Sequence, residues 1–388
     1  MKITFLGYAV PRELENYFDG LSVAGNKMQT GIIHALKEYG CDISVISVPP
    51  LIPYPYGRAL HSKRRWATDH SGIRYLLITF INLPIVKQFH QTISVFIELL
   101  KNTKKGEILL TFNAFPQIGV PASLVQKIRS LIFIPLLADL PIDDLEGRRG
   151  ISKLLRRAFD YLTEWSILNS NRLIVLSDAA ANEYAPKLPS LCIEGGVDSA
   201  ETLRYCSVKK TRKNVVYTGA LTAYSGIREA INAMQYVKSP DIILEIYGAG
   251  PLEEEIKSLI RGCNNVLLHG RISHNEILEI QSDAWLLINP RLLLDPISTM
   301  TFPSKIFEYM LSSTPVLTTK MKSFSERYSD LLYHCESSDP LHIAKRIDEI
   351  AELQESELRN TACRAFLYVA ENKTWQAQAG RIVEFIKK

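Results

Sequence analysis

The sequence predicts an α/β fold made of two successive domains, each with a mainly parallel sheet covered by helices. Short apolar runs rich in β-branched residues alternate with amphipathic helical stretches, which is the pattern of parallel β-α-β units. This alternation lapses once, near the middle of the chain, and then resumes. The length of 388 residues suits two domains. We therefore expect two Rossmann-like domains with a central cleft, which is the default place for a ligand.

The first part of the chain, residues 1–200, is predicted to form the N-terminal domain. Two of its helices are recognisable because apolar residues recur on one face, and we expect both faces to be buried. The first face contains Met28, Ile32, Ile33, Leu36 and Tyr39, and the second, in Ser152–Leu168, contains Leu154, Leu155, Ala158, Phe159, Leu162 and Trp165. The predicted strands are Lys2–Tyr8, Asp42–Val48, Glu107–Phe112, Leu131–Ala138, Arg172–Leu176 and Leu191–Ile193.

A polar, basic stretch from Ser199 to Lys213 lacks periodicity and is predicted to link the domains. The second domain is expected over residues 208–371, and residues 372–388 contain a final helix near Gln376–Lys387. The strands predicted in the second domain are Val215–Thr218, Ile242–Tyr247, Val266–His269, Trp285–Ile288, Pro315–Thr318 and Leu331–His334.

Charge and composition narrow the class of protein. The 45 basic residues are interspersed with 41 acidic ones, so the net charge of +4 is too weak to indicate nucleic acid, although it suits an anionic substrate or a membrane surface. The 6 cysteines are far apart and predict neither a zinc site nor disulfides, which fits a reducing, cytoplasmic location. No signal peptide is expected, and the apolar stretch Ile73–Val86 is shorter than the roughly 20 residues that span a bilayer.

The segment Ser298–Met310 is the most informative about chemistry. Pro303 stands where a helix would begin, with Thr301 as a candidate cap and Lys305 in the first turn. A lysine is disfavoured at the positive end of a helix unless an anion binds there. Glu308 lies three positions later on the same face, where it could accept hydrogen bonds from a ribose diol. The alternative is a surface ion pair worth a few tenths of a kcal/mol.

A second turn from strand to helix, Tyr247–Glu255, makes a useful contrast. Its helix begins with Glu253, Glu254 and Glu255, which would repel a phosphate. The two glycines of this turn also fall short of the full dinucleotide-binding pattern. Gly248 is therefore predicted to form a tight turn close to the ligand, and not a phosphate cradle.

Several segments in combination resemble the donor domain of retaining glycosyltransferases of family 4, which have the GT-B fold. The resemblance runs from about Asn214 to Leu317. In the N-terminal half, Ala24–Asn26 and Ala138–Pro141 are more loosely similar to bacterial polysaccharide and lipid-linked-sugar transferases. In such enzymes the C-terminal helix crosses back onto the first domain. The matching segments are Val216–Gly219, Leu244–Gly250, Val266–Ser273, Ile288–Arg291, Phe302–Met310 and Thr314–Leu317.

The resemblance implies a set of donor-binding residues. Glu308 matches a ribose-binding glutamate, and Gly219 matches a glycine that lets the backbone approach the donor. Gly25 matches the glycine of the first N-terminal loop. The remaining candidates are Gly270, Arg271 and Ile272, which match a segment that holds the base, together with Gly248 and the helix-start residues Thr301 and Ser304.

The sequence also departs from the family pattern at three places. Met300 stands where the family has the first glutamate of a pair, so the usual contact to the donor sugar is missing. Ala220 and Ser225 stand where many relatives have an arginine and a lysine. The N-terminal histidine that many relatives place near the donor sugar has no clear match, and Asn113 or Asp139 is expected in that region.

These departures shift the predicted chemistry onto other residues. A nucleoside diphosphate must leave with its charge neutralised, and we assign this task to Arg291 and Lys305. No metal or other cofactor is expected, because Asp143 and Asp144 look like solvated loop carboxylates. Asp139 could be the general base for the acceptor or simply a loop cap. The sequence thus predicts a hexosyltransferase-type enzyme for cell-surface glycan synthesis, with retention implied only by the family.

The acceptor is expected to be a saccharide or a lipid-linked saccharide. Tyr54–Arg74 mixes basic and aromatic residues beside an apolar run, which suits peripheral contact with an anionic membrane at its inner face. The alternative is a loop that packs over the N-terminal domain. A different class of function also stays open: the chain could be an inactive GT-B subunit that stabilises another glycosyltransferase. An epimerase or phosphorylase is disfavoured.

Overall fold

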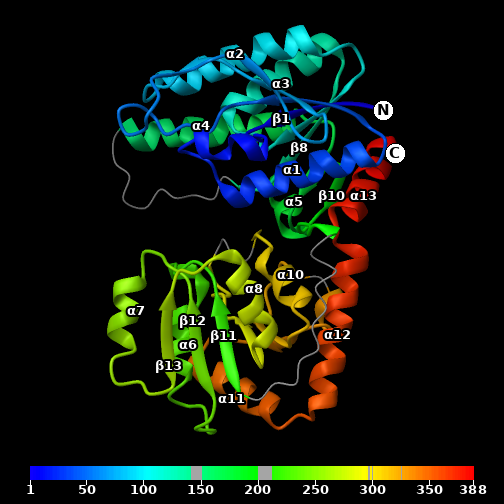
Figure 1. Cartoon of the computed structure of the whole chain (residues 1–388). Helices are drawn as coiled ribbons and strands as arrows, with labels where there is room; N and C mark the ends of the chain where they lie inside the picture. The colour runs from blue at the N-terminus through cyan, green and yellow to red at the C-terminus, as the bar shows by residue number, and fades with distance from the viewer. Residues whose placement is uncertain (141–150, 200–211, 296–297, 299, 325) are drawn as a thin grey trace. The chain divides into compact units, whose positions relative to one another are not determined.

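The computed structural model describes residues 1–140, 151–199, 212–295, 298, 300–324 and 326–388. The chain forms two compact units (Figure 1). Unit 1 consists of Met1–Gly196 together with Trp375–Lys388, and unit 2 consists of Val197–Thr374. Most of the predicted linker Ser199–Lys213, as well as Asp143 and Asp144, lies outside the described residues.

Unit 1 is built on an eight-stranded sheet in the order β10-β9-β8-β7-β1-β2-β5-β4. All neighbouring strands are parallel except β4 and β5, which form an antiparallel pair at one edge. A separate small sheet joins β3 to β6. The strands are β1 Lys2–Gly7, β2 Asp42–Ser47, β3 His61–Ser62, β4 Arg65–Thr68, β5 Arg74–Leu77, β6 Phe80–Ile81, β7 Ile108–Phe112, β8 Ile132–Leu137, β9 Leu173–Val175 and β10 Ser190–Cys192.

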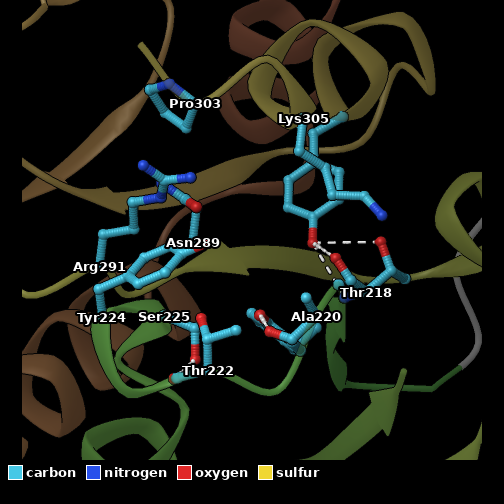
Figure 2. A pocket seen from close by; sticks show the side chains of 12 residues that line it. Thr218, Ala220, Thr222, Tyr224, Ser225, Asn289, Arg291, Pro303 and Lys305 are labelled. Carbon is cyan, nitrogen blue, oxygen red and sulfur yellow. Dashed lines mark hydrogen bonds between the residues drawn. The ribbon is translucent and has the colours of Figure 1, made fainter. Parts of the chain in front are cut away.

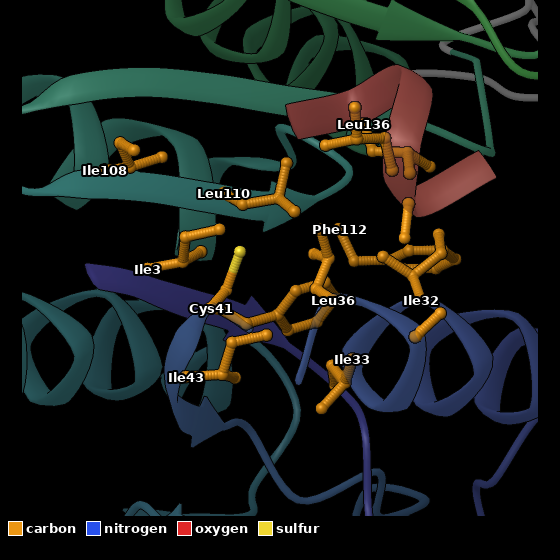
Figure 3. Packing of buried hydrophobic residues seen from close by; sticks show 14 of the residues in the cluster. Ile3, Ile32, Ile33, Leu36, Cys41, Ile43, Ile108, Leu110, Phe112 and Leu136 are labelled. Atoms are coloured by element: carbon orange, nitrogen blue, oxygen red, sulfur yellow. The ribbon is translucent and has the colours of Figure 1, made fainter. Parts of the chain in front are cut away.

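Helices cover both faces of this sheet, because alternate residues of its strands are apolar on both sides. One core combines strand residues with Ile32 and Leu36 of α1 and with Ile382 of α13, and Figure 3 shows part of it. The other core combines strand residues with Val95 of α2 and Val125 of α3. The helices of unit 1 are α1 Val23–Glu38, α2 Val86–Asn102, α3 Pro116–Arg129, α4 Ile151–Leu168, α5 Asp178–Tyr184 and α13 Trp375–Lys387, and η1 is a 3-10 helix at Arg12–Tyr17.

Unit 2 has a six-stranded parallel sheet in the order β13-β12-β11-β14-β15-β16. The strands are β11 Asn214–Thr218, β12 Ile243–Tyr247, β13 Val266–Gly270, β14 Leu286–Asn289, β15 Val316–Thr319 and β16 Tyr333–Cys335. The helices are α6 Ile227–Ala233, α7 Glu253–Leu259, α8 His274–Asp283, α10 Lys305–Leu311, α11 Pro340–Ala351 and α12 Glu355–Asn372, with short 3-10 helices η3 Ala223–Ser225 and η4 Glu326–Tyr328.

The predicted α/β class with two Rossmann-like sheets is confirmed, and each of the twelve predicted strands exists with shifted ends. The hairpin of β4 and β5 was not predicted, because β4 lies within the Tyr54–Arg74 stretch that we assigned to a membrane interface or a loop, and β5 begins at its last residue. In that stretch Arg64 donates to Glu98 over 2.8 Å, and the Arg74 guanidinium lies over the Trp66 ring. These side chains therefore have partners within unit 1.

The predicted burial of the Ser152–Leu168 helix is wrong. Leu154, Leu155 and Leu162 of α4 are exposed, and Ile167 is the large apolar residue of this helix that is fully buried. The first helix follows the prediction at Ile32, Ile33 and Leu36, whereas Tyr39 is exposed beyond the end of α1. Periodicity identifies an apolar face, but it does not determine what covers that face.

Candidate functional site

The strand order of unit 2 creates a natural binding position. From β11 the chain first builds outward through β12 and β13 and then returns to build β14 on the other side. The chain therefore leaves the carboxyl ends of β11 and β14 in opposite directions along the sheet. Such a place is called a switch point, and ligands bind there in open α/β sheets. A pocket of about 90 Å³ lies at this point (Figure 2). It is lined by Tyr217, Thr218, Gly219, Ala220, Thr222, Tyr224, Ser225, Asn289, Arg291, Pro303, Lys305 and Tyr309.

Arg291 follows β14 and is held on one side of the pocket. Its guanidinium lies over the Tyr224 ring, 5.3 Å from the centroid, and donates a long hydrogen bond of 3.4 Å to Thr301 Oγ1. Burial lowers the pKa of Arg291 below its ordinary value, although an arginine stays charged at neutral pH. Its backbone carbonyl accepts from Thr319 Oγ1 over 2.7 Å. A positioned, partly desolvated cation of this kind attracts an anion strongly, because little water screens it.

Lys305 enters the pocket from the other side, as Figure 2 shows. It is the first residue of α10, and its Nζ lies 3.9 Å from Glu308 Oε1. Thr301 does not cap this helix: the N-cap is Ser304, which makes no side-chain capping hydrogen bond. Since α10 has 7 residues, its dipole is short, and the attraction for an anion depends mainly on the two cations.

Glu308 is fixed by a buried network that connects α8, α10 and β11. Gln281, which is fully buried, donates from Nε2 to Glu308 Oε1 over 2.5 Å and to Thr218 Oγ1 over 2.9 Å. The Tyr309 hydroxyl accepts from the Thr218 backbone N–H over 2.9 Å and donates to the Thr218 carbonyl over 3.0 Å. The ends of the helix and the strand are thereby held together, and the Glu308 carboxylate has a defined position beside the pocket.

Glycines mark the ends of three neighbouring strands. Gly219, Gly248 and Gly270 follow or end β11, β12 and β13, and the Gly248 N–H donates to the Gly270 carbonyl over 2.8 Å. A Cβ on Gly248 would overlap the Gly219 carbonyl oxygen, so no larger residue fits this turn. Gly219 lines the pocket, whereas Gly248 and Gly270 do not. The backbone of Gly248 thus lies close to Gly219, and the predicted position of Gly248 near a ligand stays a prediction.

The start of α7 also follows the prediction. Glu253, Glu254 and Glu255 occupy its first turn. Lys257 pairs with Glu253 and Glu254, and Arg228 pairs with Glu255. These five charged groups, three acidic and two basic, thus pair with one another at this helix end, and none of them lines the pocket.

The other donor-binding candidates of unit 2 lie near the pocket or at some distance from it. Thr301 is a partner of Arg291, and Ser304 is exposed beside Lys305. Arg271 and Ile272 come directly after β13, which is separated from β11 by β12, and neither lines the pocket. Ala220 and Ser225 do line it, at the places where many members of the resembled family carry cations. Among the described lining residues, Arg291 and Lys305 are the charged ones.

Unit 1 has a row of polar residues along the carboxyl ends of the neighbouring strands β8, β7 and β1. Asn113 has a φ of 62° and its Oδ1 accepts from the backbone N–H groups of Ala138 and Asp139. Its Nδ2 donates to Asp139 Oδ2 over 2.9 Å, so the exposed Asp139 carboxylate is oriented by a buried neighbour. Gln117 donates to the Tyr8 hydroxyl over 2.7 Å. Burial raises the pKa of Tyr8, which keeps this phenol neutral.

Gly25 lies in the first turn of α1, where its N–H donates to Ser22 Oγ over 3.2 Å. The structure thus brings Gly219, Arg291, Thr301, Lys305 and Glu308 together in unit 2, while Asp139 and Gly25 belong to unit 1. Among the described residues, no group of three or more His, Cys, Asp or Glu side chains is arranged to hold a metal ion. In that same part of the chain no helix is both long and apolar enough to span a membrane.

Sequence analysis missed Gln281, Tyr224, Asn289 and Tyr309 as parts of this site. Gln281 carried a usable signal, since it is a polar residue beside Ile277, Ile280 and Ala284 on the apolar side of its helix. Asn289 carried another, because it is a polar residue at the end of a strand, two positions before Arg291. No sequence signal pointed to Tyr224, because it lies in a short loop whose position beside the pocket cannot be read from the sequence.

Comparisons with known proteins point to one class of enzyme. Residues 201–363 match the family model described as glycosyl transferases group 1. No curated protein matches the sequence. Solved structures with the same fold include sucrose-phosphate synthase from Thermosynechococcus elongatus, with a TM-score of 0.69, 14% identity and coverage of 100% of this chain and 98% of that chain.

Two further structures match over their whole length. HepE from Anabaena in complex with UDP has a TM-score of 0.68 and 13% identity, with 100% of both chains covered. The catalytic domain of starch synthase IV from Arabidopsis thaliana, bound to ADP and acarbose, has a TM-score of 0.67 and 12% identity, with 100% and 99% covered. The fold is therefore that of GT-B glycosyltransferases, and the family model that matches most of unit 2 is one of glycosyltransferases.

Proposed function

We propose that this glycosyltransferase moves a hexosyl group, with retention of anomeric configuration, from a nucleoside-diphosphate sugar to a saccharide or lipid-linked saccharide in cell-surface glycan synthesis. One observation supports the proposal most: Arg291 and Lys305 converge on a pocket at the switch point of unit 2, with the Glu308 carboxylate beside it. Two cations next to one acceptor of hydroxyl hydrogen bonds suit a diphosphate joined to a ribose.

The reaction asks mainly for stabilisation of a leaving group. The bond from the sugar C1 to the diphosphate oxygen breaks, and that oxygen keeps the electron pair. An acceptor hydroxyl oxygen forms the new bond to C1, and its proton passes to a base. In the proposal, Arg291 and Lys305 neutralise the departing diphosphate without the help of a metal ion. The Lys305–Glu308 distance of 3.9 Å is long for an ion pair, so the ammonium can turn toward a phosphate at little cost.

Asp139 is our candidate for the residue that orients or deprotonates the acceptor hydroxyl. Its support is the hydrogen bond from Asn113 Nδ2, which fixes one carboxylate oxygen and leaves the group exposed beyond the carboxyl end of β8. A carboxylate that is oriented before substrate arrives loses less entropy when it acts as a base. Gly25, Gly270, Arg271 and Ile272 remain proposed donor contacts on the resemblance alone.

The choice of nucleotide can be narrowed by the neighbours. HepE was solved in complex with UDP and with UDP-glucose, and starch synthase IV was solved with ADP. We therefore propose UDP-sugars and ADP-sugars as the first donors to test. A lipid-linked acceptor would bring the chain to the inner face of the membrane as a peripheral protein.

One feature of the pocket favours a second candidate function, that of an inactive partner subunit. Ala220 and Ser225 line the pocket, and they supply no charge where many members of the resembled family have cations. Hydrolysis of UDP-sugars and ADP-sugars by the purified chain separates the candidates. Slow release of UDP or ADP supports the enzyme, and complete inactivity together with nucleotide binding supports the partner.

The direct test of the proposed clamp replaces its cations one at a time. Lys305→Ala and Arg291→Ala should each lower turnover by roughly 100-fold or more, since each removes a charge that stabilises the leaving group. Lys320→Ala is a matched control, because that lysine is exposed and pairs with Glu336 away from the pocket. Unchanged melting temperatures would show that the fold is intact, and near-normal turnover in both pocket variants would refute the clamp.

A further inference from the structure

Exposed apolar side chains are concentrated on three helices of unit 1. Helix α3 packs against both α2 and α4, so the three helices are contiguous. Their exposed large apolar residues are Val86, Phe89, Ile93 and Ile97 on α2, Leu124 and Ile128 on α3, and Leu154, Leu155, Tyr161, Leu162 and Leu168 on α4, and we call this set the α2–α4 face.

Helix α2 shows that this exposure is organised. Phe89, Ile93 and Ile97 recur every four residues and are 70%, 57% and 41% exposed. Val95 and Leu99, on the opposite side of the helix, are buried against the sheet. A helix that covers a sheet ordinarily turns its polar side to water. Helix α2 is instead apolar on two sides, and contiguous exposed apolar surface of this kind marks a protein or membrane contact.

The exposed charges around the α2–α4 face are mostly basic. Exposed basic residues lie on these helices and directly after α2, namely Lys101, Lys104, Lys105, Lys127, Arg129 and Arg157. Asp160 pairs with Arg156, and the buried Glu98 pairs with Arg64. Glu164 is the exposed acidic residue among the described residues of the three helices. An apolar surface bordered by cations complements an anionic lipid surface.

We propose that the α2–α4 face docks unit 1 on an anionic lipid bilayer. The aromatic and aliphatic side chains enter the zone between headgroups and acyl chains, and the lysines and arginines meet the lipid phosphates. The proposal rests on the proposed function in one respect: a lipid-linked acceptor would be reached at the same membrane surface. The contact itself needs no catalysis, so it can fail or succeed independently of the transferase.

The α2–α4 face is a better candidate than the Tyr54–Arg74 stretch. In that stretch Arg64 is bound to Glu98, Arg65 lies over the Phe18 ring and Arg74 lies over the Trp66 ring. These three arginines thus already have partners in unit 1. Around the α2–α4 face, Lys127 lies over the Trp165 ring and Arg129 donates to the Leu100 carbonyl, whereas Lys101, Lys104, Lys105 and Arg157 are exposed.

Flotation of the full-length chain with vesicles tests the contact. Vesicles of phosphatidylglycerol and phosphatidylcholine in equal parts should carry the wild type upward at low salt, and vesicles of phosphatidylcholine alone should carry much less. The triple variant F89S/I93S/I97S should bind at least about tenfold more weakly, because three apolar side chains no longer enter the bilayer. These residues are exposed, so the fold should tolerate serine.

The matched control is the triple variant Y236S/L341S/L367S, which removes three exposed apolar side chains from unit 2. It should float like the wild type. Equal flotation of the α2 triple and the wild type, or no flotation of the wild type, would overturn the proposal. So would sedimentation showing a wild-type dimer that the α2 triple dissociates, because the face would then bind a second copy. Nucleotide binding should be the same in all three proteins, which separates this test from that of the transferase.

Discussion

At the scale of single residues, the position of Glu308 depends on Gln281. This glutamine has no exposed surface, and its Nε2 is shared between Glu308 and Thr218, while its Oε1 accepts no hydrogen bond from a described residue. A buried amide is retained at such a place when it orients another group, since burying it unsatisfied is costly. We infer that Gln281 is a positioning residue for the carboxylate that would bind ribose.

The variant Gln281→Leu tests this inference. The variant should raise the KM for the donor roughly tenfold and change kcat little. The reason is that it disorders Glu308, which would bind the donor, and leaves the cations Arg291 and Lys305 in place. Calorimetry with a nucleoside diphosphate and its 2′-deoxy analogue gives a sharper measurement. Wild type should prefer the ribonucleotide, and the variant should lose most of that preference. An unchanged preference would show that Gln281 has only a structural role.

The sequence predicted the residues of the site that belong to a local pattern. Lys305 and Glu308 were found because three positions separate them on a helix. The sequence signal of Gln281 as a polar residue on an apolar helix side did not reveal its role, because the partners of Gln281 and Tyr224, Glu308 and Arg291, lie far away in the chain. Thr301 was assigned as the N-cap of α10, whereas the N-cap is Ser304. The boundary was open because Pro303 is compatible with more than one start of the helix.

At the scale of elements, the unpredicted hairpin of β4 and β5 is stabilised by one carboxylate, that of Asp69. Asp69 Oδ1 accepts from the backbone N–H groups of Ser71 and Ile73, and its Oδ2 lies 2.8 Å from His34 Nε2 and 3.2 Å from the Tyr75 hydroxyl. Burial alone would raise the pKa of Asp69, but these hydrogen bonds outweigh it and hold the pKa below its ordinary value. The turn is thereby tied to helix α1.

The hydrogen bonds of Asp69 make part of the free energy of unfolding dependent on pH. Since the pKa of Asp69 is lower in the folded than in the unfolded chain, its contribution is fully present above about pH 4 and is lost as the pH falls through the folded-state value. Asp69→Asn should therefore cost about 2 kcal/mol in urea unfolding at pH 7, and the difference from wild type should shrink in acid. Asp241→Asn, at an exposed turn of unit 2, is the control. A cost that stays constant with pH would contradict the account.

Helix α4 shows the limit of prediction at this scale. Its apolar spacing correctly predicted a helix, but Leu154 and Leu162 are exposed. The hairpin was missed for a different reason. Strands of four residues, such as Arg65–Thr68, are too short to show a clear alternation of apolar and polar residues. Local patterns therefore identified elements long enough to show a period, and the tertiary partners of those elements remained undetermined.

At the scale of the whole molecule, unit 1 is completed by the end of the chain. Trp375 packs against Gly31 of α1 and against Gly196, where a Cβ on either glycine would overlap the indole. Ile382 and Ile386 continue the contact into the core. The α/β alternation predicted both sheets, and the placement of the final helix on the first domain came from the family resemblance, because periodicity does not say which unit a helix joins.

Truncation after Thr374 should consequently unfold unit 1. Removing the four large buried apolar side chains of α13, Trp375, Ile382, Val383 and Ile386, at roughly 1.5–3 kcal/mol each, takes away about as much free energy as stabilises a whole domain. Hydrogen exchange should show that β1 and β2 lose protection. A chain that lacks only the exposed Lys387 and Lys388 should behave like the full-length protein. Retained protection in the truncated chain would mean that α13 is dispensable.

The central claim is that a nucleoside diphosphate binds at the switch point of unit 2. A crystal structure of the protein soaked with UDP or ADP tests this claim most directly. We predict that the phosphates lie within hydrogen-bonding distance of Arg291 and Lys305 and that the ribose hydroxyls contact Glu308. Density for the nucleotide at another place, with these three side chains unchanged, would contradict the account.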